Sequence, residues 1–370
     1  ITTQTGKITL TDTSVSVADI NAVAPVTSGV VTATITSGAA SVLKALTTTS
    51  TDAITMTVNA ESSGATAAAD LVSLNGKTNQ VITMTAVTSV SGSYADLYNI
   101  YVTNAGQYNG EGDEAVTITG TVTATQADAI ADVTSGVVTA ASITADTASA
   151  LNSALSDAQV NAYTLTINGS SATASDITSL DNKTSGSITL SGTSMTITVA
   201  SGETLDLSGV TNSLSGTLTI NDSTGDNNIK GTSANDTLNL SSGNDTINLG
   251  NGNDTINVSN MSDLTSADTI TDTSGIDTLN INGSGTIASS DFNVSGFEYL
   301  NLSTGADVVT FTDKSSFDTF KSKFSSAVDT KDGNDEFKFS SAITEDLDFS
   351  KINNLEKLSF SENDDTVTFE

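Results

Sequence analysis

The chain has 370 residues and a formal net charge of −31, with 43 acidic residues against 12 basic ones, and every basic residue is lysine. Histidine, cysteine and tryptophan are absent. These absences exclude an imidazole base, a thiol nucleophile, a disulfide scaffold and a His/Cys zinc site, and the charge argues against a nucleic-acid partner. Since no stretch approaches the roughly 20 apolar residues of a membrane span, we expect no transmembrane insertion.

Residues 1–215 are rich in Thr, Ala, Ser and Val, and short runs alternate an apolar residue with threonine. Such alternation indicates half-buried strands. The runs lie at residues 8–11, 54–57, 82–85, 116–119 and 164–167, with one more at 217–220. Weakly helical segments at 17–23, 40–46, 95–101 and 149–155 separate them. A strand and a short helix every ~20–30 residues are typical of a solenoid.

These units are copies of one another. VTSGVVTA occurs at 26–33 and again at 133–140, and KTNQVITM at 77–84 and KTSGSITL at 183–190 are related. An aspartate (Asp19, Asp70 or Asp176) lies eight residues before the Thr in three of the four copies, and Gln126 takes that place in the other. The alternative is a set of β-sandwich domains, whose hairpins should show Asn-Gly or Asp-Gly turns. Asn-Gly pairs do occur, but a helical segment usually follows them, so we prefer the solenoid.

From residue 231 the chain reads GTSANDTLN, LSSGNDTIN and LGNGNDTIN, a nine-residue repeat with Asp236, Asp245 and Asp254 in register. An aliphatic residue follows each aspartate by two positions. A stack of short turns, each offering a carboxylate and several carbonyls, suits a hard divalent cation. The register extends one step upstream to Asn227 and one step downstream to Asp263, where the aliphatic residue is lost.

The period restarts five residues late with Asp268 and Asp277, which are nine apart. Isolated echoes of the repeat follow at 305–309, 333–337 and 363–367. Between them, residues 315–328 predict a short amphipathic helix with Phe317, Phe320 and Phe324 on one face.

The repeats resemble the RTX nonapeptide, G-G-x-G-x-D-x-U-x, of calcium-binding parallel β-rolls. The resemblance implies Ca²⁺ held by aspartates 18 residues apart, so that Asp236 pairs with Asp254, and Asp245 with Asn227 before it and Asp263 after it. It also implies that loop carbonyls complete each site. The candidate metal ligands are Asn227, Ala234, Asp236, Gly243, Asp245, Gly252, Asp254, Asp263, Asp268 and Asp277.

The sequence also departs from that pattern. Thr232, Ser241 and Ser242 stand where the family has glycine pairs, and Ala234 replaces a further glycine. Fewer or weaker sites than in a long roll are therefore expected. The alternative is an acidic array of turns in which aspartate and asparagine ladders form without metal.

We therefore expect a mainly β chain built as a parallel β-solenoid in three parts. A strand/short-helix solenoid occupies 1–215, an RTX calcium β-roll 216–285, and an irregular continuation of the roll with a C-terminal secretion or capping region 286–370. Residues 216–370 hold 26 acids and 8 lysines, against 17 and 4 in residues 1–215. Because so acidic a part repels itself, bound Ca²⁺ is the expected remedy.

The resemblance implies type I secretion through an uncleaved C-terminal signal. The acidic tail DDTVTFE at 364–370 is compatible with such a signal, and the segment starting at Ile1 shows no secretory signal peptide. We expect a structural, non-enzymatic surface-layer (S-layer) subunit on the extracellular cell surface. Its partners would be copies of itself in a two-dimensional lattice, with a cell-surface glycan or lipopolysaccharide as a further partner. The alternatives are a segment of a large RTX adhesin and an ice-binding protein that uses outward TxT threonines.

Overall fold

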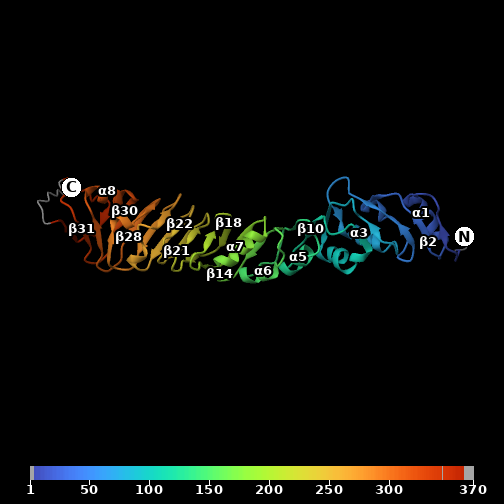
Figure 1. Ribbon diagram of the computed structural model, residues 1–370, viewed down its shortest axis with the longest axis horizontal. Coiled ribbons are helices and arrows are strands. Elements are labelled where there is room, and N and C mark those ends of the chain that lie inside the picture. Colours follow the sequence, from blue (N-terminus) through green and yellow to red (C-terminus); the bar gives the residue numbers. More distant parts are fainter. Residues whose placement is uncertain (1–3, 344, 362–370) are drawn as a thin grey trace. The chain divides into compact units, whose positions relative to one another are not determined.

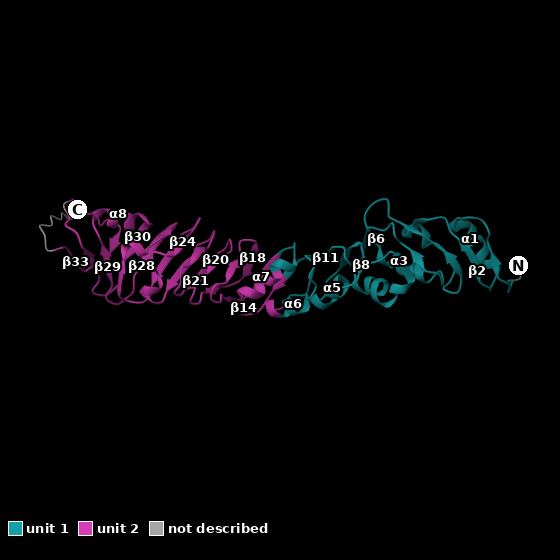
Figure 2. Cartoon of the chain, viewed as in Figure 1, with its two compact units in different colours: residues 1–145, 150–165, 181–187 teal, residues 146–149, 166–180, 188–370 magenta. Residues whose placement is uncertain are grey.

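The computed structural model describes residues 4–343 and 345–361, and it is mainly β with parallel strands. The chain forms two compact units, shown in Figure 2: unit 1 contains residues 1–145, 150–165 and 181–187, and unit 2 contains 146–149, 166–180 and 188–370. The acidic tail at 364–370 and the last echo of the repeat at 363–367 lie outside the described residues.

In unit 1 the strands are short and parallel. One sheet has the order β1 (Ile8–Thr9), β2 (Val31–Thr34), β4 (Ala53–Thr55), and another has the order β12 (Ala162–Tyr163), β11 (Val138–Ala140), β10 (Ala115–Thr119), β8 (Ser89–Ser93), β6 (Thr66–Ala67). Two-stranded sheets pair β3 (Gly38–Ala39) with β5 (Val58–Asn59) and β7 (Ile82–Thr83) with β9 (Tyr108–Asn109).

Short helices separate these strands. They are α1 (Val17–Val23), α2 (Ala40–Leu43), α3 (Ala68–Asn75), α4 (Tyr94–Tyr98), α5 (Ala124–Ala131) and α6 (Ala148–Ala154), together with a π-helix at Asn99–Thr103 and 3₁₀ turns at Ala24–Val26 and Ala105–Gln107. A further helix, α7 (Ala174–Lys183), lies mostly in unit 2. The repeated aspartate or glutamine of the sequence copies starts helices. Ser16 and Asp19 form a capping box at α1, as Thr123 and Gln126 do at α5, so each side chain satisfies a backbone N–H of the other residue.

A column of polar side chains ties successive coils of unit 1 together. Each member lies just before a strand or near its start and accepts a backbone N–H from the preceding coil: Val31 N–H donates to Asp52 (2.8 Å), and Val138 N–H donates to Asn161 (2.9 Å). Thr184 accepts from Tyr163 in the same way, at 2.9 Å. The threonine shared by the sequence copies takes part in this bonding, since Thr78 and Thr184 each accept a backbone N–H from the preceding coil.

Unit 2 is dominated by three parallel sheets, whose strands lie side by side in Figure 1. The nine-stranded sheet has the order β14 (Ser171–Thr173), β16 (Met195–Thr198), β19 (Leu218–Asn221), β21 (Asp236–Leu240), β23 (Thr255–Val258), β25 (Thr278–Ile281), β28 (Phe297–Asn301), β30 (Phe324–Asp329), β32 (Ile352–Asn353). The five-stranded sheet has the order β17 (Thr204–Asp206), β20 (Asn228–Lys230), β22 (Thr246–Asn248), β24 (Thr269–Thr271), β27 (Val294–Ser295).

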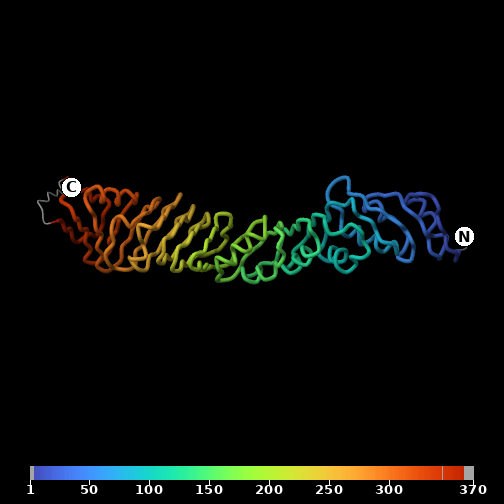
Figure 3. Tube along the Cα trace, viewed as in Figure 1, coloured from blue at the N-terminus to red at the C-terminus, as the bar shows by residue number. Residues whose placement is uncertain are grey.

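The four-stranded sheet has the order β26 (Thr286–Ala288), β29 (Val308–Phe311), β31 (Glu336–Phe339), β33 (Lys357–Ser359). A three-stranded sheet contains β13 (Leu165–Ile167), β15 (Ile188–Gly192) and β18 (Val210–Leu214). From β19 to β25 the chain alternates between the nine-stranded and the five-stranded sheet, as the Cα trace in Figure 3 allows the reader to follow. Each passage adds one parallel strand, an arrangement consistent with a β-roll.

The repeated aliphatic position forms the core of this region. Ile229, Leu238, Ile247 and Ile256 are each 0 % exposed, because every strand turns the same residue inward. Asparagines on the neighbouring positions form a ladder in which Nδ2 donates to Oδ1 of the preceding strand, at 2.7–3.1 Å along residues 221, 239, 257, 280 and 301. The ladder holds the strands of the nine-stranded sheet in register.

The expected helix at 315–328 is only partly correct. Helix α8 spans Lys314–Ser322, and Phe317 and Phe320 are buried on it, but Phe324 begins strand β30. All three rings still meet in one aromatic cluster; Phe320, for example, has its ring centroid 5.7 Å from that of Phe324. The helical period therefore identified core residues correctly and placed the end of the helix too late.

Candidate metal centre

The repeated aspartates occupy one structural position: each opens a strand of unit 2 or directly precedes one. Asp236 is the first residue of β21, and the others stand immediately before β22, β23, β24, β25, β29 and β31. All of them are at most 1 % exposed: Asp236, Asp245, Asp254, Asp268, Asp277, Asp307 and Asp335. Burying seven carboxylates demands compensation, since an isolated buried charge is strongly unfavourable.

One column of these side chains runs along the nine-stranded sheet. Asp254 accepts the backbone N–H of Asp236 at 2.7 Å, and Asp277 accepts that of Asp254 at 2.8 Å. Glu298 on β28 closes the column by accepting the N–H of Asp277 at 2.8 Å. Every carboxylate therefore bonds to the coil before it, so the column links successive coils through charge-assisted hydrogen bonds.

A second column runs along the five-stranded sheet and corrects one expected pairing. Asp245 accepts the N–H of Asn227, and Asp268 accepts the N–H of Asp245, both at 2.8 Å. Asp268 thus takes the place expected for Asp263. Asp263 instead ends a 3₁₀ helix (Met261–Asp263), where its Oδ2 accepts hydrogen bonds from the backbone and side chain of Asn260.

A third column lies at the four-stranded sheet, beyond the uninterrupted repeats. Asp335 accepts the N–H of Asp307 at 2.8 Å, and Glu356 accepts that of Asp335 at 3.0 Å. The isolated echoes of the repeat at 305–309 and 333–337 therefore build the same kind of link as the complete nonapeptides do.

The second oxygen divides the carboxylates into two classes. In Asp236, Asp268 and Asp307 that oxygen accepts hydrogen bonds from a nearby Thr or Ser; in Asp236, for example, Oδ2 accepts the N–H of Thr232 at 2.6 Å and its hydroxyl at 3.1 Å. In the other class it is buried without any hydrogen-bond partner in the described chain. These open oxygens belong to Asp245, Asp254, Asp277 and Asp335, and the amide oxygen of Asn227 is buried without a partner in the same way.

Glycine two residues before each open aspartate explains the G-x-D spacing. A Cβ on Gly252 (φ 137°) would lie 2.8 Å from the carbonyl oxygen of Ala234 and 2.9 Å from Oδ1 of Asp254. A Cβ on Gly275 (φ 151°) would lie 1.5 Å from the carbonyl oxygen of Gly252. Carbonyls of one loop therefore approach the next loop at a point where only glycine fits. Gly243 makes the same close approach to the loop before it.

Burial makes these groups resist ionisation. It raises the pKa of Asp236 and of Asp245 to about 6, and the pKa of Asp254 to about 7. For Asp254 the charges of Asp236 and Asp277 raise the pKa further. The pKa of Asp277 is also raised by burial. A divalent cation beside the open oxygens would relieve both causes, because it supplies the missing partner and the missing positive charge.

One residue that the sequence analysis missed completes the most compact group. Carboxylate oxygens of Asp254, Asp272 and Asp277 all lie within 4.8 Å of one another, and Oδ2 of each is buried without a hydrogen-bond partner in the described residues. Burial raises the pKa of Asp272 to about 7. Asp272 lies five residues before Asp277, at the opening of the same loop, where the family pattern has glycine. This position, five residues before Asp277, is the sequence signal that could have identified Asp272.

The donor set fits calcium. It consists of oxygens alone, from carboxylates and closely approaching loop carbonyls, and Ca²⁺ takes 6–8 such ligands in irregular geometry. The residues that would hold the ion are those with open oxygens. Asp236 and Asp268 lie in the same columns with their second oxygen already hydrogen-bonded, and Ala234 and Gly252 contribute carbonyls that face the following loop.

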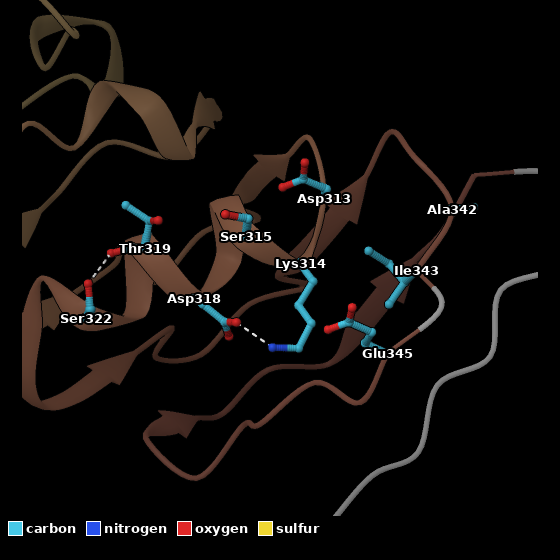
Figure 4. A pocket seen from close by; sticks show the side chains of 9 residues that line it. All are labelled: Asp313, Lys314, Ser315, Asp318, Thr319, Ser322, Ala342, Ile343 and Glu345. Carbon is cyan, nitrogen blue, oxygen red and sulfur yellow. Dashed lines mark hydrogen bonds and ion pairs between the residues drawn. The ribbon is translucent and has the colours of Figure 1, made fainter.

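The pocket beside α8 is separate from these columns. Figure 4 shows that Asp313, Asp318 and Glu345 line it together with Lys314. Asp318 forms an ion pair with Lys314, and Asp313 caps α8 by accepting the N–H of Ser316 at 2.9 Å. Two of its three carboxylates therefore have structural roles in the helix.

Residues 222–256 match the RTX calcium-binding nonapeptide repeat, in four copies. This match covers the first two residues of both main columns, and it establishes Ca²⁺ as the cofactor of these repeats, which are typical of secreted, extracellular proteins. No curated protein and no solved structure matches the chain. None of the helices in residues 4–343 and 345–361 is long and apolar enough to cross a membrane.

Proposed function

We propose that the protein is an S-layer subunit that folds when it meets calcium outside the cell and assembles with copies of itself into a lattice. One observation supports this proposal: parallel coils pair with carboxylate oxygens between them that are buried and have no hydrogen-bond partner among the described residues. Without a cation, adjacent coils bring uncompensated charges together. With Ca²⁺ the same oxygens become ligands, so folding and calcium binding are coupled.

Secretion fits this coupling. A chain that stays unfolded where calcium is scarce can be exported and then folds where calcium is plentiful. Export by a type I system through a C-terminal signal, and residence on the cell surface, are part of the proposal.

The net charge supports calcium-dependent assembly as well. Subunits with a net charge of −31 repel one another, and only 12 lysines are available for contacts between copies. Divalent ions that bridge carboxylates of neighbouring subunits would remove this barrier. A cell-surface glycan or lipopolysaccharide is the proposed anchor. A calcium-dependent adhesin would share the folding behaviour but would remain monomeric, which gives a direct distinction.

Negative-stain imaging of the purified full chain in Ca²⁺ and in EGTA tests the proposal. We expect ordered two-dimensional sheets in calcium alone. Soluble monomers under both conditions would reject the S-layer function and favour the adhesin. Asp254→Asn is the matched variant: it removes one ligand from the three-carboxylate group, so sheets should need a higher calcium concentration to form.

A further inference from the structure

A pair of glutamates in unit 1, far along the chain from the nonapeptides, repeats the chemistry of the open aspartates. Glu114 directly precedes β10 and is 0 % exposed, and its Oε1 is buried without a hydrogen-bond partner among the residues that the structure describes. Glu111, three residues earlier, is half-buried, and its Oε2 also has no partner in the described residues.

Glu114 stands where the other coils of unit 1 use a fully satisfied side chain. Asp52 also directly precedes a strand, β4; one of its oxygens accepts the N–H of Val31 and the other that of Thr49, each at 2.8 Å. Asn161, which directly precedes β12, accepts the N–H of Val138 through its neutral amide. Glu114 differs from both, because it combines a full charge with an oxygen that accepts nothing.

The hydrogen bonds of Glu114 fix its carboxylate without satisfying it. Oε2 accepts the N–H of Gly112 at 2.8 Å and the hydroxyl of Tyr101 at 3.2 Å. Tyr101 belongs to the π-helix, an element often found at functional sites. Both donors act on one oxygen, so Oε1 is left for another partner.

The loop that carries the pair is held in place by glycines. Gly110 (φ 89°) passes so close to Thr85 that a Cβ would lie 2.4 Å from its Cγ2. On the other side, Ser135 donates to the carbonyl of Gly112 at 2.7 Å, and the hydroxyl of Thr134 donates to the carbonyl of Glu114 at 3.0 Å. The loop is thus fixed to the coils on both sides.

Within residues 4–343 and 345–361, the charged groups that act on Glu111 and Glu114 are carboxylates, with no lysine among them. Burial raises the pKa of Glu111 to about 7, and the charge of Glu114 raises it further. The pKa of Glu114 is raised by burial and by the charge of Asp113. Either a proton or a cation must compensate two such carboxylates.

We propose that Glu111 and Glu114 bind a calcium ion in unit 1, independently of the nonapeptides. The ligand atoms are carboxylate oxygens on an irregular, glycine-kinked loop, as Ca²⁺ prefers. Mg²⁺ suits this place less well, because it gives up its water reluctantly and Oε1 of Glu114 is closed to solvent. The ion ties the loop to the π-helix through the carboxylate of Glu114, and so stabilises unit 1 as the nonapeptide ions stabilise unit 2.

Counting bound ions in the full chain tests the proposal. We expect the Glu111→Gln/Glu114→Gln variant to bind one calcium ion fewer per chain than the wild type in equilibrium dialysis with Ca²⁺. Asp113→Asn is the matched control, because it removes a charge from the exposed side of the same loop and should leave the count unchanged. An unchanged count in the double variant would overturn the proposal and assign a shared proton to the pair.

Terbium luminescence gives a second, local readout. Four of the six tyrosines lie between residues 94 and 108, and Tyr299 is the only one in unit 2. In a Tyr299→Phe background, tyrosine-sensitised Tb³⁺ emission should be strong, fall on addition of Ca²⁺, and be lost in the double glutamine variant. Emission that survives in that variant contradicts the proposal. If circular dichroism shows that the double variant is unfolded, Glu111→Gln alone decides by the same two measurements, since Glu111 is half-buried.

Discussion

Asp254→Asn should stabilise the protein without calcium and lose most of that advantage when calcium is bound. The carboxylate of Asp254 is 1 % exposed, its Oδ2 has no partner, and it shares a small space with Asp272 and Asp277. The asparagine amide has the same shape as the carboxylate, and its oxygen can still accept the hydrogen bond from the backbone N–H of Asp236. It removes the charge that the cation-free fold must bury.

The magnitude follows from the pKa. Burial and neighbouring charges raise the pKa of Asp254 from 3.8 to about 7. A pKa difference of about 3 corresponds to up to about 4 kcal/mol of penalty on the ionised form above that pH. Without calcium, at about pH 8, the variant should therefore be the more stable protein. With saturating calcium it lacks a ligand, and a hundredfold weaker affinity removes about 2.7 kcal/mol of the calcium-dependent stabilisation, which cancels most of that gain.

Urea unfolding followed by circular dichroism, in EGTA and in Ca²⁺, measures both effects. Asp236→Asn is the control, because Asp236 is equally buried but both of its oxygens already accept hydrogen bonds from Thr232. Burial raises the pKa of Asp236 only to about 6, and the amide gives up hydrogen bonds from Thr232 worth about 1 kcal/mol, so that variant should gain less stability than Asp254→Asn without calcium. An Asp254→Asn protein that is less stable than the wild type in EGTA would refute the reasoning.

Three further outcomes follow. Without calcium, the pKa of Asp245 and Asp254 in the folded protein exceeds the unfolded value of 3.8, so protonation of these aspartates stabilises the fold fully below about pH 4. This contribution to the free energy of unfolding is lost as the pH rises through about 6–7, which unfolding curves in EGTA at several pH values measure. Calcium affinity should fall below about pH 6, because protons then compete for the same oxygens; calorimetry at two pH values checks this. Gly275→Ala should destabilise unit 2 by more than about 1 kcal/mol in thermal melts with calcium, whereas Gly209→Ala, which has open space around it, should not.

The nonapeptide register predicted much of the site because it is a local rule. A nine-residue period places each aspartate before a strand and each aliphatic residue inside, so Asp245 with Ile247 could be placed from spacing alone. The short helices near 17–23, 40–46, 95–101 and 149–155 were predicted, whereas α3 and α5 were missed, although Thr123 and Gln126 form a capping signal within four residues at α5. Where the period broke, spacing failed: Asp263 ends the 3₁₀ helix Met261–Asp263, and Asp268, five residues later, takes the next place in the column.

Other features depend on contacts that no spacing encodes. The hydroxyl of Thr232 donates hydrogen bonds to both carboxylate oxygens of Asp236, so neither oxygen lacks a partner. The nine-residue spacing does not encode this contact, which depends on the geometry of the loop. Asp272 joins its cluster across two coils. Glu114 belongs to no repeat of the nonapeptide type, and its open oxygen becomes evident only when its hydrogen bonds are placed.

Hydrogen exchange at the amides that donate to the carboxylate columns tests the central claim most directly. The backbone N–H groups of Asn227, Asp236, Asp245 and Asp254 each donate to a side chain of the next coil. If calcium joins these coils, the exchange of these four amides near neutral pH should be slow in Ca²⁺ and fast in EGTA. Equal protection of these four amides in both conditions would contradict the account.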